Sequence, residues 1–137
     1  MNLIDRVERA IVNTGAELHQ IPLNGLKAVT VKVGNKIAVF ADVGAFSRVS
    51  ELASAEAHEY GHVKSGAFYD GTSDGLTILR QEYRADKAAI RRFLPPGKIK
   101  KAMSRGFTET WQLSELFGFE ESFINRAIYI YQTEGKL

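Results

Sequence analysis

The sequence contains no cysteine, which excludes disulfides and cysteine-ligated metal sites. Any metal site must therefore use histidine and carboxylate side chains, and histidine itself is scarce, with three in 137 residues. No apolar run reaches the length of a membrane span, and the stretch from Met1 to Arg6 becomes charged too early for a signal peptide. These absences fit a reducing compartment, and we expect a cytoplasmic protein without a membrane partner.

Repeats, low-complexity tracts and long linkers are also missing, so nothing divides the chain into independent domains. The composition, with 45% hydrophobic and 25% charged residues, is typical of one soluble domain with one core.

Positive charge is concentrated in the stretch 80–105, where nine Lys or Arg stand against Glu82 and Asp86. This stretch predicts one basic surface. Such a surface is either a solvated helix face, which balances an otherwise acidic chain, or a patch that binds a partner.

Hydrophobic periodicity predicts an α+β fold. Apolar residues recur at helical spacing over 3–12, and this first helix should end near Gly15. Alternation over 27–33 and 36–43 predicts two strands, joined by the turn Gly34-Asn35 into a β-hairpin or small antiparallel sheet.

Helical patterns account for most of the second half of the chain. A helix over 51–65 should be capped by Ser47 or Ser50 and end at Gly66, and a glycine-rich loop should follow to residue 75. Further helices are predicted over 76–93, 98–104, 108–117 and 120–133.

The helix over 51–65 carries the motif H-E-x-x-H in its second half. His58 and His62 are four residues apart, so their imidazoles lie one turn apart on one face and can bind one metal ion. Glu59 lies near that face, where it can act as the general base of a metallopeptidase. The same residues also fit a helix with two surface histidines, so the rest of the chain must distinguish these interpretations.

The helix over 76–93 carries two carboxylates, Glu82 and Asp86, within its apolar stripe. We expect this stripe to consist of Leu79, Tyr83, Ile90 and Phe93. Buried anions need a cation or strong donors nearby, and a metal held by two histidines would compensate them. We therefore predict Glu82 as the third ligand of Zn²⁺ or another divalent ion, and Asp86 as the acceptor that orients a ligand imidazole. Alternatively, Glu82 is a core-edge carboxylate paired with an arginine.

Four further side chains are candidates for stabilising an oxyanion or contacting substrate, namely Tyr60, Tyr69, Tyr83 and His19. The sequence does not rank them, and His19 also fits an ordinary surface histidine. We expect the strand 36–43 to offer its edge to an extended peptide.

Three segments together resemble the ImmA/IrrE family of cytoplasmic metallopeptidases, which are zinc peptidases of the gluzincin type. They are A-H-E-Y-G-H at 57–62, E-Y-R-A-D at 82–86 and F-L-P-P at 93–96. The resemblance covers most of the chain. It implies a small zincin-like metallopeptidase core over 1–96, with a C-terminal helical subdomain over 97–137 that packs on the core.

The resemblance also implies a function. Its members are linked to prophages and mobile elements, and they cleave a DNA-binding repressor as antirepressor proteases. By this resemblance we expect a zinc-dependent endopeptidase with one specific protein substrate, a helix-turn-helix repressor. Many relatives carry Asn where this chain has Asp86.

An alternative comes from the last two predicted helices, which flank Gly118 and are spaced like a helix-turn-helix pair. On this hypothesis the chain is a non-catalytic regulatory or DNA-binding module, and its metal site is structural or vestigial. Only Arg126 offers a basic reader on the exposed side of the second helix, so this indication of DNA binding rests on one residue. The sequence does not indicate an oligomeric state.

Overall fold

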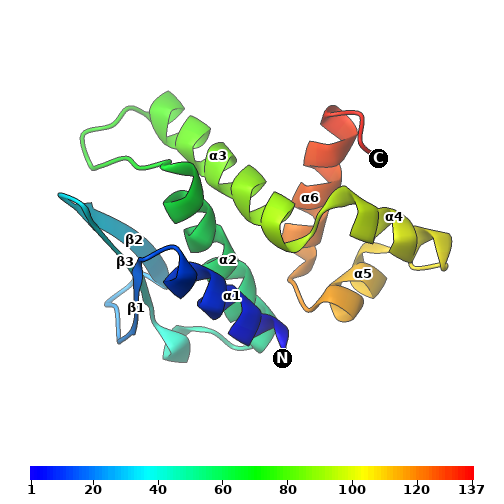
Figure 1. The fold of residues 1–137 in the computed structure, drawn as a ribbon, viewed down its shortest axis with the longest axis horizontal. Helices are drawn as coiled ribbons and strands as arrows, with labels where there is room; N and C mark the ends of the chain where they lie inside the picture. Colours follow the sequence, from blue (N-terminus) through cyan, green and yellow to red (C-terminus); the bar gives the residue numbers. More distant parts are fainter.

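The computed structural model describes residues 1–137 and has an α+β fold, with six α-helices and one three-stranded sheet (Figure 1). The sheet lies beside α1 and α2, and the last three helices gather at the far end of α3. The elements in chain order are α1 (Leu3–Asn13), β1 (Glu17–Gln20), β2 (Ala28–Val33), β3 (Lys36–Ala41), a 3-10 turn (Val43–Ala45), α2 (Val49–Ser65), α3 (Gly75–Phe93), α4 (Pro96–Ser104), α5 (Thr110–Phe117) and α6 (Glu121–Thr133).

The sheet has the strand order β1-β3-β2, so β3 is its central strand. β2 and β3 form the predicted hairpin, and Gly34 takes the left-handed conformation in its turn, with φ of 60°. β1 pairs parallel to β3, so the sheet is mixed and not antiparallel. Because β3 is paired with β1 on one side and β2 on the other, the prediction that the strand 36–43 offers a free edge is wrong. The two edge strands of the sheet are β1 and β2.

α2 begins without the predicted serine cap. Arg48 occupies the N-cap position and makes no side-chain cap bond, whereas the Ser50 hydroxyl donates to Glu120 Oε1 at 2.6 Å. The predicted end is confirmed, because Gly66 closes the helix in the left-handed region, with φ of 70°.

α2 and α3 approach each other closely at Gly61. A Cβ atom on this residue would lie 1.9 Å from the carbonyl oxygen of Ala85, which explains why the motif helix contains a glycine. The buried face of α3 combines the small residues Ala85 and Ala89 with the larger Ile90 and Phe93. The predicted apolar stripe is wrong at Leu79 and Tyr83, because the side chains of both are exposed.

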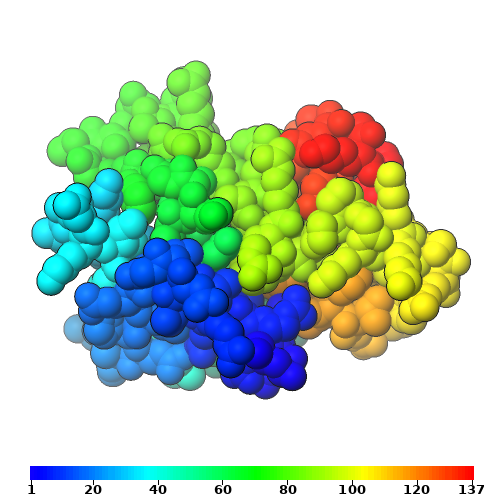
Figure 2. All heavy atoms as spheres, in the orientation of Figure 1, coloured from blue at the N-terminus to red at the C-terminus, as the bar shows by residue number.

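One continuous apolar core joins the two halves of the chain. Its buried residues include Val7 of α1, Ile90 of α3 and Ile124 of α6. Tyr131 of α6 is fully buried, and its hydroxyl donates to the carbonyl oxygen of Leu94 at 2.9 Å. Figure 2 shows α6 lying directly beside α3 on the viewed face. No helix has the length and apolarity needed to cross a membrane.

The basic residues of α3 are partly neutralised within the molecule. Lys87 and Arg91 both pair with Glu134 of the C-terminal segment, and Arg84 donates to the carbonyl oxygen of Ser65 at 2.8 Å. Arg80 makes no ion pair. Only some side chains of the predicted basic surface are therefore without a partner in the molecule.

Candidate metal centre

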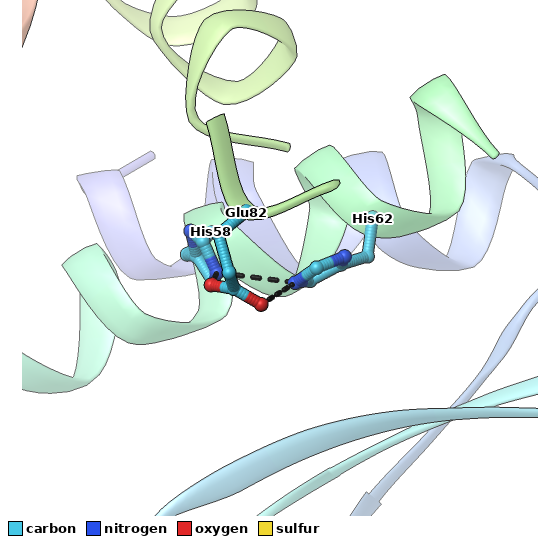
Figure 3. Close-up of side chains that lie close together, drawn as sticks. All are labelled: His58, His62 and Glu82. Carbon is cyan, nitrogen blue, oxygen red and sulfur yellow. Dashed lines mark hydrogen bonds and ion pairs between the residues drawn. The ribbon is translucent and has the colours of Figure 1, made fainter. Parts of the chain in front are cut away.

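His58 and His62 of α2 and Glu82 of α3 point toward one another across the helix pair (Figure 3). The Nε2 atoms of the two histidines lie 3.1 Å apart. Glu82 places Oε2 at 2.7 Å from His58 Nε2 and Oε1 at 3.1 Å from His62 Nε2. One ligand atom from each residue falls within 4.8 Å of the others, so the three form a group that can hold a metal ion.

The second nitrogen of each imidazole fixes the orientation of its ring. His58 Nδ1 donates to Asp86 Oδ1 at 2.7 Å, and His62 Nδ1 donates to the carbonyl oxygen of Ala67 at 2.6 Å. Asp86 and Ala67 thus each accept a hydrogen bond from the Nδ1 atom of one histidine. The Nε2 atoms of the two histidines are left facing each other. Asp86 thus lies where the sequence predicted an acceptor for a ligand imidazole.

The donor set fits a divalent metal. Two imidazoles and one carboxylate are the ligands of many catalytic zinc sites, which keep a further position open. Tetrahedral ligands at zinc-nitrogen distances are roughly 3.3 Å apart. The two Nε2 atoms, 3.1 Å apart, are close to that separation.

The same hydrogen bonds shift the pKa values of His58 and Glu82. Burial lowers the pKa of His58, but the hydrogen bonds to Asp86 and Glu82 outweigh burial and raise it to about 10. The hydrogen bond from His58 lowers the pKa of Glu82 to about 2. Without metal, His58 is therefore an imidazolium ion that donates to both carboxylates.

Glu59 lies beside the metal group and is 7% exposed. The hydroxyl of Thr30, on β2, donates to Glu59 Oε1 at 2.8 Å. Strand β2 therefore orients Glu59, the predicted general base, through its Oε1 atom. The other carboxylate oxygen of Glu59, Oε2, makes no hydrogen bond within the protein.

These groups line one cleft of about 320 Å³ between β2 and the helix pair. The β2 side of the cleft is mostly apolar and includes Ala28 and Val29. The loop after α2 forms part of the wall with Phe68 and Tyr69.

Of the four predicted oxyanion or substrate contacts, only Tyr69 reaches the cleft. Its hydroxyl donates to Glu82 Oε1 at 2.7 Å, and this hydrogen bond raises the pKa of Tyr69 to about 12. Its ring is also partly exposed to solvent.

The other three side chains lie elsewhere. Tyr60 follows Glu59 by one residue, about 100° round the helix, and is buried edge-on against Phe93. Tyr83 faces solvent on α3 beside Lys87. His19 lies on β1, pairs with Glu17 at 2.9 Å and stacks on Phe40.

Sequence reasoning did not identify Thr30 or the carbonyl of Ala67 as parts of the site. Thr30 is one polar residue in an alternating strand, and only the pairing of β2 beside α2 reveals its contact. A backbone carbonyl leaves no side-chain signal. Arg126, predicted as an exposed reader, instead pairs with Asp86.

Comparisons of the chain with protein-family models, with characterised proteins and with solved structures gave no match.

Proposed function

We propose that this protein is a cytoplasmic, metal-dependent endopeptidase of the ImmA/IrrE type, with one Zn²⁺ held by His58, His62 and Glu82. The observation that supports this function best is the convergence of two Nε2 atoms and one carboxylate in a cleft that also contains Glu59. The sequence motifs described above are consistent with it.

The residues around the metal group have the chemistry that peptide hydrolysis needs. A divalent ion bound there would supply Lewis acidity for a carbonyl group and a water molecule. Glu59, held through Oε1 by Thr30, has Oε2 free to take a proton from water and deliver it to the departing amine. Tyr69 is the remaining candidate for contacting the developing oxyanion, since its hydroxyl already lies at Glu82.

The free edge of β2 borders the same cleft. An extended peptide that pairs with this edge would pass beside His58 and Glu59, which gives the site a way to hold a substrate backbone. We propose a narrow substrate, a DNA-binding transcriptional repressor, because the resembled family acts on such proteins.

Substitution of the proposed base tests this function. Zinc-loaded protein and the Glu59→Gln variant are added to separate portions of a bacterial lysate, and the new N-termini in each are mapped by mass spectrometry. We expect new termini in one or a few proteins with the unchanged chain and none with the variant, which should still bind zinc. Identical termini in both samples would contradict the proposed mechanism.

A DNA-binding function for α5 and α6 has less support. The guanidinium of Arg126 is paired with Asp86, so the one basic reader expected on α6 is directed toward the metal centre. If the chain is a non-catalytic module, both lysate samples will lack new termini.

A further inference from the structure

We infer that Arg126 of α6 is a positioning residue of the metal centre and acts on it through Asp86. This inference rests on the proposed metal site. A chain of contacts leads from the C-terminal helix to a metal ligand: Arg126 Nη1 pairs with Asp86 Oδ2, and Asp86 Oδ1 accepts from His58 Nδ1 at 2.7 Å.

Asp86 needs two partners to hold one orientation. A carboxylate with one engaged oxygen can turn about its last bond, whereas a carboxylate held at both oxygens cannot turn without breaking a contact. The Asp86 side chain is only 12% exposed, so few water molecules can replace a lost partner. Arg126 therefore fixes the plane in which His58 is held.

The surroundings of Asp86 provide no substitute for Arg126. A second hollow of about 310 Å³ opens on the α6 side of His58 and Glu82, and Arg126 forms part of its wall. The other polar residues there include Ser54 of α2 and Ser122 of α6, but neither donates to Asp86. Arg126 is the only cation paired with this carboxylate besides His58.

Two effects of Arg126 on a bound cation oppose each other. Its positive charge disfavours a metal ion nearby, but 57% of its side chain is exposed, so water and salt screen that repulsion. Its hold on Asp86 acts by direct contact and is not screened in this way. The orienting effect should therefore dominate, and loss of Arg126 should weaken metal binding.

A double-mutant cycle measures this coupling, with Zn²⁺ affinity determined by competition with a chromogenic chelator. Arg126→Gln should weaken Zn²⁺ binding roughly fivefold, less than loss of a direct partner of a ligand. The same substitution in an Asp86→Asn background should change the affinity less than about twofold, because the pair is already absent. Arg105→Gln, at an exposed arginine that follows α4 and makes no ion pair, controls for charge loss and should leave affinity unchanged.

Unchanged or tighter binding in Arg126→Gln, or an equal loss in both backgrounds, would overturn the inference. If Arg126→Gln does not fold by circular dichroism, Arg126→Met, which cannot donate to Asp86, is measured in both backgrounds, with the same pattern expected. An unchanged chain that binds no Zn²⁺ would overturn the metal centre together with this role. Binding without coupling would overturn only the role of Arg126.

Discussion

His58 is the residue at which the metal-free and metal-bound states must differ. Without metal its two nitrogens donate to Asp86 and Glu82, and its pKa is about 10. A metal ion bound at this site would replace the proton on Nε2. Without metal, the ion pairs of His58 with Asp86 and Glu82 therefore stabilise the folded protein. Metal binding would replace the contact at Nε2 by coordination of the metal.

This ion pair makes the stability of the metal-free protein depend on pH. The raised pKa of His58 contributes stability that is complete below about pH 6.5 and is lost as pH rises through about 10. The lowered pKa of Glu82 contributes stability that is present above about pH 4.5 and is lost as pH falls through about 2. With metal removed by EDTA, we expect unfolding free energy to fall by on the order of 2 kcal/mol between pH 6.5 and 9.

Urea unfolding at several pH values measures this dependence. His58→Gln is the matched control, because it removes the titrating imidazole and should flatten the decline above pH 6.5. A decline of equal size in the variant would assign the pH dependence to other groups.

Thr30 should matter for the rate and not for the metal. Thr30→Val keeps the shape of the side chain but removes the hydroxyl that donates to Glu59. A hydrogen bond to a charged group contributes about 1.5 to 3 kcal/mol, so we expect the cleavage rate of the mapped substrate to fall at least about tenfold. Zn²⁺ affinity should not change, and Thr30→Ser should restore most of the rate. Equal cleavage rates in Thr30→Val and the unchanged chain would show that the Thr30 hydroxyl plays no part in catalysis.

Local spacing explains which site residues the sequence could predict. His58 and His62 share a helix face by their separation of four, and Glu82 and Asp86 share another by the same rule. Thr30, like Arg126, reaches the site from a distant element, and no local pattern records such a contact.

At the scale of elements, the close contact of α2 with α3 at Gly61 sets the distance between the histidines and Glu82. Gly61→Ala would place its Cβ against the backbone of Ala85 and push the helices apart. We expect a loss of about 2 kcal/mol or more in unfolding free energy, despite the better helix propensity of alanine. Zn²⁺ affinity should fall as well, because α3 carries Glu82.

Gly97→Ala is the matched control for this substitution. Gly97 lies in α4 and has no atom within 4 Å of an added Cβ. Alanine there should be neutral or stabilising by up to about 1 kcal/mol in urea unfolding. If both variants lose the same stability, the packing explanation for Gly61 is wrong.

Elements with strong periodicity were predictable, and those defined by pairing were not. The hairpin β2–β3 and all six helices lie within a few residues of their predicted positions. β1 has the sequence E-L-H-Q, with one apolar side chain, so only its pairing with β3 identifies it. The predicted apolar stripe of α3 is correct at Ile90 and Phe93 but wrong at Leu79 and Tyr83. The contact of α3 with Gly61 is instead made by the backbone of Ala85, a small residue that apolar periodicity does not single out.

At the scale of the whole molecule, the segment 97–137 completes the core and should be required for folding. It contributes buried residues such as Leu113, Phe119 and Ile130 to the same cluster as Val7. The fragment 1–96 would expose that surface to water and lose the partner of Asp86. We expect it to lack a cooperative thermal transition by circular dichroism, whereas the full chain shows one. A sharp transition in 1–96 would show that this part folds alone.

Metal binding by His58, His62 and Glu82 is the claim on which the proposed function depends. The most direct test is Zn²⁺ stoichiometry and affinity, from elemental analysis and chelator competition on the unchanged chain, Glu82→Ala and Asp86→Ala. We expect one Zn²⁺ per unchanged chain, an affinity loss of about 10- to 100-fold in Asp86→Ala, and a larger loss in Glu82→Ala. An unchanged chain that binds no Zn²⁺, or variants that both retain full affinity, would contradict metal binding by this group.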